Sequence, residues 1–166
     1  MSSDPPLSSH STRVSKAQYV ILHQQQTRLA IALTSVREVL RLSEQRLTPI
    51  PNSPDFVLGL TNVRGDILTV ADFGKFLGLQ PLNPRHDESR IVVVEAPRRQ
   101  DPTQPLIPLG LAVSHVETVV SLDPNQLRSA AEASASLVPF LQGLYNDHGQ
   151  LFSVIDMAAI ATCSRW

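Results

Sequence analysis

Five histidines and one cysteine are the side chains of this sequence best suited to metal binding or nucleophilic catalysis. No two histidines have H-x-x-x-H spacing, and Cys163 has no second cysteine to pair with; the histidines are His10, His23, His86, His115 and His148. A metal centre needs convergent ligands, and a nucleophile needs an adjacent base. The sequence shows neither arrangement. We therefore expect a protein that is not an enzyme, with no catalytic residues, no metal site and no bound cofactor.

Glycine placement and overall charge exclude further classes of function. No glycine-rich phosphate loop follows a predicted strand, because the 7 glycines stand at turns and element ends. The net charge of −1 disfavours nucleic acid as a partner, since binding phosphates requires concentrated Lys and Arg. No apolar run approaches the ~20 residues that span a bilayer, and no signal-peptide pattern is present. The lone cysteine also fits a reducing compartment. We expect a cytoplasmic protein without direct membrane insertion.

Charged side chains could instead recognise another protein. Arg37, Glu38 and Arg41 lie close together in sequence, and Arg64 lies in a predicted turn. Arginine suits recognition because its planar head makes paired hydrogen bonds while its stem covers apolar surface. These charges fit a recognition surface, and they fit an ordinary solvated face equally well.

A repeated hairpin positions one of these arginines. Residues 56–72, FVLGLTNVRGDILTVAD, align without gaps to residues 140–156, FLQGLYNDHGQLFSVID, and agree at 7 of 17 positions. The pattern predicts two strands joined by the turn Asn62-Val63-Arg64-Gly65, in which Gly65 takes a positive φ. Asp72 is expected to cap a short helix that Gly78 ends.

The duplication extends beyond the hairpin. Residues 29–43, LAIALTSVREVLRLS, are similar to residues 109–123, LGLAVSHVETVVSLD, at an offset of 80. The run 19–33 predicts another hairpin, 36–42 an extended segment, 91–94 a strand, and 124–136 a mobile loop or short helix. Many short strands with turn residues between them favour small barrels. We expect a mainly β fold of two related halves, about 17–80 and 88–160.

Polar segments set the expected boundaries. Residues 1–16 are rich in Ser and Pro and are expected to be a disordered tail. The domain is then 17–161, with a C-terminal tail at 162–166. The connector 48–54, the seam 80–89 and the loop 96–105 are rich in proline or polar residues.

The differences between the two copies indicate where a partner binds. Residues that recur, such as Gly59 and Asp72, most simply serve the fold. Val63 and Arg64 face Asp147 and His148 in the second copy, and the charges at Arg37, Glu38 and Arg41 are also replaced there. We expect the partner at Val63 and Arg64.

These residues resemble the CheW-like chemotaxis adaptors over roughly 17–160. The matching pieces are V-x-E-V at 36–39, T-P-I-P at 48–51, P-D-F-V-L-G-L-T-N-V-R-G at 54–65, and V-A-D-F-G-K-F-L-G at 70–78. The resemblance implies two intertwined SH3-like five-stranded β-barrels with short helices and no enzymatic activity. It also implies an adaptor that couples the cytoplasmic tip of a methyl-accepting chemoreceptor to a CheA-type histidine kinase, and that is recruited to membrane-bound receptor arrays.

The resemblance carries a set of protein-binding residues onto this chain. By position in the family's motifs, Arg64 and Glu38 contribute to partner contacts, and Val36, Asn62 and Gly65 support them. No receiver or kinase domain accompanies the match, which is typical of a stand-alone adaptor.

Two departures from the family pattern bear on function. The family often has a basic residue where this chain has Gly74, and the polar insertion at 97–105 lengthens a loop. These differences fit a type IV pilus motility or phototaxis pathway as well as flagellar chemotaxis. The alternative to receptor–kinase coupling is a β-barrel interaction module of a different signalling complex that does not contact a receptor.

Overall fold

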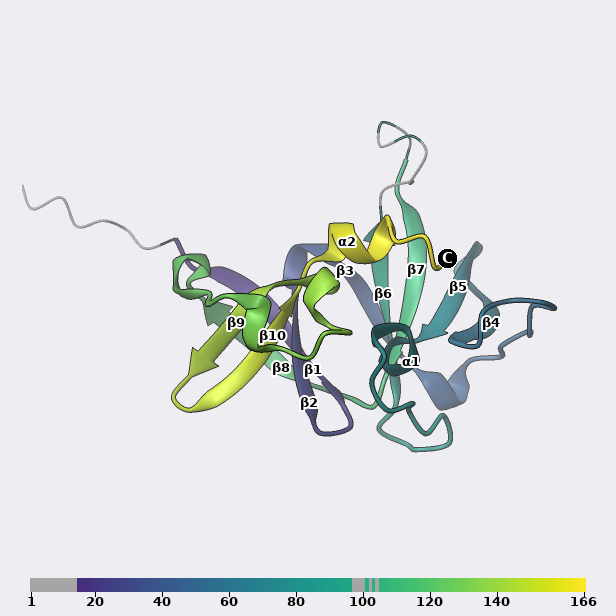
Figure 1. Ribbon diagram of the computed structural model, residues 1–166. Helices are drawn as coiled ribbons and strands as arrows, with labels where there is room; N and C mark the ends of the chain where they lie inside the picture. Colours follow the sequence, from purple (N-terminus) through teal and green to yellow (C-terminus); the bar gives the residue numbers. More distant parts are fainter. Residues whose placement is uncertain (1–14, 97–100, 102, 104) are drawn as a thin grey trace, which may run out of the picture.

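A computed structural model describes residues 15–96, 101, 103 and 105–166 (Figure 1). The expected tail at 1–16 and the insertion at 97–105 lie largely outside the described residues. No described helix is long and apolar enough to cross a membrane.

The first repeat forms five strands and a short helix. The strands are β1 (Ala17–Gln24), β2 (Thr27–Ala32), β3 (Val36–Arg41), β4 (Val57–Val63) and β5 (Asp66–Asp72), followed by α1 (Phe73–Leu77); the 3-10 turns η1 (Leu33–Ser35) and η2 (Leu42–Glu44) flank β3. The predicted hairpin at 19–33, the extended segment at 36–42 and the hairpin at 56–72 are therefore confirmed.

The second repeat has the same order of elements. Its strands are β6 (Arg90–Ala96), β7 (Ile107–Val113), β8 (His115–Leu122), β9 (Leu141–Asp147) and β10 (Gln150–Ile155), followed by α2 (Met157–Ala161); η3 (Pro124–Gln126), η4 (Ala130–Glu132) and η5 (Val138–Phe140) lie between β8 and β9. The segment expected as a mobile loop or short helix thus contains two of these short helical turns.

Each sheet takes strands from both repeats. One sheet has the order β8-β1-β2-β10-β9 and the other β3-β6-β7-β5-β4. The expected division into a barrel at 17–80 and a barrel at 88–160 is therefore wrong, whereas the intertwined arrangement is confirmed. The two repeats exchange strands: β1 and β2 are separated from the other strands of the first repeat, and β1 pairs with β8 while β2 pairs with β10 of the second repeat.

Parallel pairing joins the two repeats in both sheets. β10 runs parallel to β2, with Val154 opposite Ala30, and β5 runs parallel to β7, with Val70 opposite Gly110. All the other strand pairs are antiparallel. Parallel neighbours require a long connection, and here 34 residues lie between β5 and β7 and 117 lie between β2 and β10.

Backbone bridges between loop and strand help to close each sheet. Thr48 pairs with Leu60, and Arg128 pairs with Leu144 at the equivalent place in the second sheet. A Cβ on Gly59 would lie 2.5 Å from the Thr48 carbonyl oxygen, and a Cβ on Gly143 would lie equally close to Arg128 O. The glycines that recur in the two hairpins are therefore required for this close backbone approach.

One apolar core lies between the two sheets. It includes Ile31 of β2, Val92 of β6 and Leu111 of β7, together with Phe76 of α1 and Ile160 of α2. Two smaller apolar clusters are each built mainly from the side chains of one sheet, one around Val70 and the other around Phe152. Because the central core draws on both repeats, neither repeat can bury its apolar surface alone.

Asp72 caps α1 as predicted, and Gly78 ends the helix in the left-handed conformation with φ 74°. One carboxylate oxygen of Asp72 accepts the Lys75 N–H at 3.1 Å, and the other accepts the Leu82 N–H, also at 3.1 Å. Burial raises the pKa of Asp72 above its usual value, and these backbone hydrogen bonds oppose that rise.

Candidate protein-binding surface

The turn of the β4–β5 hairpin consists of two residues, Arg64 and Gly65. Val63 is paired with Asp66 across the hairpin, and φ is 54° at Arg64 and 89° at Gly65. Two consecutive positive φ values are typical of the type I′ turn that matches the twist of a hairpin. The turn is thus displaced by one residue from the expected Asn62-Val63-Arg64-Gly65, and Arg64 is at its tip.

Asn62 and Gly65 shape this turn. The Gly65 N–H donates to the Asn62 side-chain oxygen at 3.0 Å. The second hairpin repeats the bond, with the Gly149 N–H donating to Asn146 at 2.8 Å. Since both copies share this hydrogen bond, Asn62 and Gly65 hold the turn that carries Arg64. This structural role does not depend on any contact between these two residues and a partner.

Val63 does not belong to the exposed surface. Its side chain is buried and packs in the small core cluster with Leu68, Val70 and Ile91. The expectation that Val63 meets a partner is therefore wrong, because strand alternation turns it inward next to the turn. Arg64, by contrast, has 76% of its side chain exposed.

β3 brings Glu38 to the same place. The register of β3 against β6 shifts between Val36 and Glu38, which leaves Arg37 as an extra residue in the edge strand. Such a bulge changes the direction in which neighbouring side chains point. Val36 is half-buried and packs against the central core, whereas Glu38 lies 3.6 Å from the Arg64 guanidinium.

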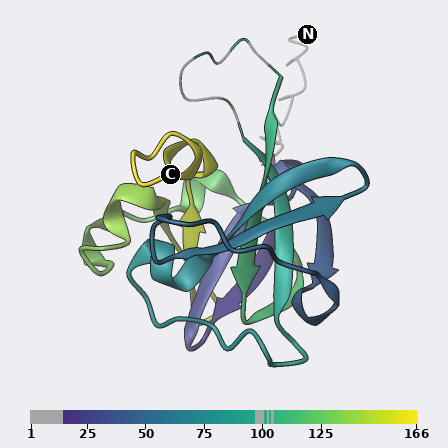
Figure 2. The ribbon, with the colours of Figure 1, turned by 90° about the vertical axis from the view of Figure 1, so that its right-hand side faces the viewer.

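Two ion pairs connect β3 to the hairpin. Arg64 pairs with Glu38, and Arg37 pairs with Asp66 at 2.8 Å, so each arginine reaches the acid on the other element. The hydrogen bond to Asp66 raises the pKa of Arg37 still further. In Figure 2 the β4–β5 hairpin projects from its sheet beside β3. Tertiary structure thus joins the two residues that the family resemblance had placed separately on β3 and on the turn.

Glu38 is the less accessible member of its pair. Its side chain is only 15% exposed, and its Oε1 atom is buried without a hydrogen-bond partner among the described residues. A buried carboxylate oxygen without a donor is costly, and a water or a partner's donor would satisfy it.

Apolar side chains and a shallow groove border these charges. Val39 on β3 and Ile67 on β5 are 42% and 66% exposed. The groove runs beside β4 and is lined by Glu44, Gln45, Arg46, Thr48, Leu60, Thr61, Asn62 and Ile67. We call the set Val39, Arg37, Glu38, Arg64, Asp66 and Ile67 the hairpin surface.

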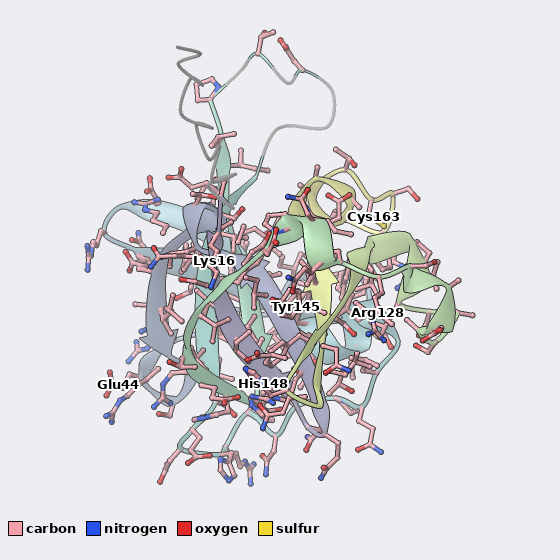
Figure 3. All side chains as sticks on the ribbon, turned by 90° about the vertical axis from the view of Figure 1, so that its left-hand side faces the viewer. Lys16, Glu44, Arg128, Tyr145, His148 and Cys163 are labelled. Atoms are coloured by element: carbon pink, nitrogen blue, oxygen red, sulfur yellow. The ribbon has the colours of Figure 1, made fainter. Side chains whose placement is uncertain are left out.

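The second repeat places different chemistry at the equivalent positions. Glu117, which corresponds to Arg37, accepts two hydrogen bonds from Arg28 at 2.8 and 2.9 Å and lies 2.5 Å from His23. The His23 hydrogen bond is the largest cause of the lowered pKa of Glu117; burial partly offsets it, and Arg28 lowers it further. His148 takes the place of Arg64 at the hairpin tip, and its side chain is 97% exposed (Figure 3).

Gly74, the position where the family often has a basic residue, is buried. A Cβ here would lie 2.3 Å from the Gln24 side-chain nitrogen and equally close to Gln80 O. Gln24 fills this space and donates to Gln80 O at 3.1 Å. No larger side chain fits at this position, so it offers a partner no contact through a side chain.

The histidines that the structure describes do not assemble into a metal centre. His23, His86 and His115 line one hollow together with Glu88, but no group of three metal-ligating residues among those described has suitable geometry. His23 and His115 pack with ring centroids 5.7 Å apart, and His23 bonds to Glu117 instead.

The CheW-like domain model matches residues 18–164 of the chain, which is nearly all of the part that carries the duplication. The chain belongs to the CheW-like domain family. Among curated relatives, chemotaxis protein CheW of Thermotoga maritima is 28% identical over 132 residues, covering 80% of this chain and 79% of the relative. The probable chemotaxis protein CheW of Rhizobium etli is 26% identical over 133 residues, covering 78% and 77%.

A solved structure agrees with the fold of this CheW-like chain. The crystal structure of scaffolding protein TtCheW from Thermoanaerobacter tengcongensis superposes with a TM-score of 0.76 at 22% identity, covering 92% of this chain and 97% of that one. The agreement confirms the mainly β class of two five-stranded SH3-like barrels. The family membership identifies the chain as a chemotaxis-type scaffold or adaptor.

Sequence reasoning missed three members of the hairpin surface, Val39, Asp66 and Ile67. Asp66 follows the turn directly, and its pairing with Arg37 could have been suspected only from opposite charges on two elements whose contact was unknown. Ile67 lies in a predicted strand beside Leu68, and because Leu68 is buried, strand alternation turns Ile67 outward.

Proposed function

We propose that this CheW-like chain couples methyl-accepting chemoreceptors to a CheA-type histidine kinase, acting in the cytoplasm at membrane-bound receptor arrays. The observation that carries the proposal is the contact between Arg64 and Glu38 at the hairpin surface. The family resemblance assigned partner contacts to each of these two residues from separate motifs, and in the fold the two side chains form an ion pair.

The chemistry of the hairpin surface fits protein recognition. It combines an exposed arginine, a poorly solvated carboxylate with an unsatisfied oxygen, and two exposed aliphatic side chains. Protein interfaces favour arginine beside apolar groups, and a desolvated charge there contributes to specificity. A scaffold of this kind does no chemistry itself; the receptor's conformation biases the kinase through contacts that differ between two states.

The pathway in which the adaptor works is a separate part of the proposal. The relatives from T. maritima and R. etli are named as chemotaxis proteins, and protein FrzA of Myxococcus xanthus is 42% identical over only 60 residues, or 35% of this chain. Flagellar chemotaxis, type IV pilus motility and phototaxis are all compatible with this chemistry. Co-purification of the adaptor with one receptor distinguishes these outputs.

The test compares binding of the wild type and turn variants to the cognate CheA-type kinase and to the cytoplasmic tip of the chemoreceptor. We expect Arg64→Glu to weaken binding to at least one of them by about tenfold or more, equivalent to ~1.4 kcal/mol. Arg64→Gly removes the side chain while retaining the positive φ of the turn, and it should weaken binding in the same assay. Both variants should keep the far-UV circular dichroism and melting temperature of the wild type.

A matched control lies at the other hairpin. His148 has φ 49°, close to the 54° of Arg64, so His148→Gly makes the same backbone change at the equivalent site. Its binding should stay within about twofold of wild type. If folded Arg64 variants bind normally, the hairpin surface is not the contact; if the wild type binds neither kinase nor receptor, the coupling function itself is wrong and an interaction module of another complex takes its place.

A further inference from the structure

Trp166 rests in a recess lined by aromatic rings. Its indole stacks on Phe76 with ring centroids 4.8 Å apart and 21° between the planes, and it meets Phe56 edge to face at 5.4 Å. The indole N–H donates to the Ile160 carbonyl at 2.7 Å. The expected tail at 162–166 is therefore in contact with the body of the domain.

Arg165 reaches the same recess. Its guanidinium donates a hydrogen bond to the Phe76 carbonyl, and its central carbon lies 5.7 Å from the ring centroids of both Phe76 and Phe140. Cations over aromatic faces at this range are attracted by the ring quadrupole. Two adjacent side chains thus make stacking, cation–π and hydrogen-bonding contacts to one small area.

The recess is built where the two repeats meet. Phe56 precedes β4, Phe140 precedes β9, and they are equivalent positions of the duplication; Phe76 lies in α1. Figure 1 shows α2 above the junction of the two sheets, with the segment that follows it running toward the side of β5. Cys163, labelled in Figure 3, lies in that segment.

The two repeats use the segment after their helix differently. Leu82, 84 residues before Trp166, is 6% exposed in a core cluster, and its N–H is bonded to Asp72. Trp166 remains 36% exposed and lies on rings contributed largely by the other repeat. The first segment completes a barrel core, whereas the second occupies a surface recess whose walls are formed by other elements.

We propose that the recess of Phe56, Phe76 and Phe140 is a docking site for a peptide segment with an adjacent arginine and aromatic residue, and that Arg165-Trp166 occupies it in the free protein. The contacts of Arg165 and Trp166 show which chemistry the site accepts. Phe76 stacks on a planar ring, and Phe56 meets that ring edge to face. A cation lies near the rings of Phe76 and Phe140, and the carbonyls of Phe76 and Ile160 accept hydrogen bonds from N–H donors. The site shares no residue with the hairpin surface, so this proposal stands apart from receptor–kinase coupling.

The tethered segment competes with any such partner. A segment joined by a short chain has an effective concentration on the order of millimolar. An external peptide with the same contacts should therefore bind at least ~10-fold more tightly when the resident residues are removed.

The experiment uses a variant lacking residues 164–166 and a fluorescein-labelled peptide of residues 160–166 carrying Cys163→Ser. We expect fluorescence anisotropy to show saturable binding to the shortened protein and at least tenfold weaker binding to the intact chain. Peptides with Arg165→Ala or Trp166→Ala should each bind the shortened protein at least about fivefold more weakly. Saturable binding of the wild-type peptide that is weakened to this extent in both variant peptides supports the proposal.

The intact chain provides a second readout because Trp166 is its only tryptophan. Its emission should be blue-shifted and protected from acrylamide, and Arg165→Ala should reduce both effects. If the shortened protein fails to fold by circular dichroism, the full-length double variant Arg165→Ala/Trp166→Ala serves as the acceptor. A folded acceptor that does not bind the peptide, or that binds it no better than the intact chain does, overturns the proposal.

Discussion

Arg64 and His148 occupy the same backbone position with different side chains. Both have a positive φ, both precede a glycine, and both turns are closed by an asparagine oxygen. A non-glycine residue in the left-handed region is strained relative to glycine. The difference between the two hairpins therefore lies in what the tip presents and not in how the chain turns.

Glu117 is the residue whose protonation has the clearest consequence for stability. Its pKa is lowered in the folded state by His23 and Arg28, from an ordinary value of 4.5. A lowered pKa gives stability that is present above the ordinary value and is lost as the pH falls through the folded value. We expect Glu117→Gln to reduce the free energy of unfolding by about 0.5–1 kcal/mol at pH 7, a modest value because the side chain is 35% exposed.

Denaturant unfolding at pH 7 and pH 3 checks this expectation. The difference between wild type and Glu117→Gln should shrink at pH 3, where the wild-type carboxylate is increasingly protonated; Asp72 is unchanged in both proteins, so its own titration cancels. Glu44→Gln is the control, because Glu44 and Arg41 form a solvent-exposed pair at 3.7 Å. A Glu117 effect that stays constant from pH 7 to pH 3 contradicts the electrostatic origin.

Among the elements, the helices α1 and α2 are capped in the same way, but the two capping aspartates do not make the same hydrogen bonds. Asp72 and Asp156 each accept a helix N–H, from Lys75 and Ala159. Asp72 also accepts the Leu82 N–H and is only 3% exposed. The same capping residue therefore anchors an additional stretch of chain in the first repeat.

We expect Asp72→Ala to destabilise the fold by about 2–3 kcal/mol and Asp156→Ala by about 1 kcal/mol. The larger loss follows because removing Asp72 leaves the buried Leu82 N–H without its acceptor. Chemical denaturation of the two alanine variants measures the difference directly. Equal losses would show that the Asp72–Leu82 bond adds nothing beyond the cap.

The whole molecule is stabilised by exchange between its repeats. Two strands of each repeat complete the sheet of the other, and the central core takes residues from both. Half of a sheet exposes unpaired strand edges and an open apolar face, which a chain of that length cannot stabilise by itself.

Cutting the chain in the seam between α1 and β6 tests this interdependence. We expect fragments 1–84 and 85–166 to lack a cooperative thermal transition when separate, and to recover native-like circular dichroism and one cooperative transition when mixed. Analytical ultracentrifugation should then show a one-to-one complex. A separate fragment that melts cooperatively as a monomer would contradict the exchanged arrangement.

Local chemistry explains what could be predicted from the sequence. The hairpins, the extended segment of β3, the Asp72 cap and the Gly78 helix end depend on neighbouring residues and on strand alternation, and all were predicted. The exact position of the turn was not, because Asn62 and Gly65 mark its neighbourhood while strand register decides which two residues lie at the tip.

The sequence by itself determined the elements, the duplication and the family, because turn residues, caps and ordered motifs act over short distances along the chain. Only the tertiary structure decided which strands pair, that Val63 is buried, that Arg64 meets Glu38, and that Trp166 rests on Phe76. These contacts join residues far apart in sequence. Nothing in local periodicity distinguishes a sheet closed within one repeat from a sheet shared between two, since both bury the same alternating faces.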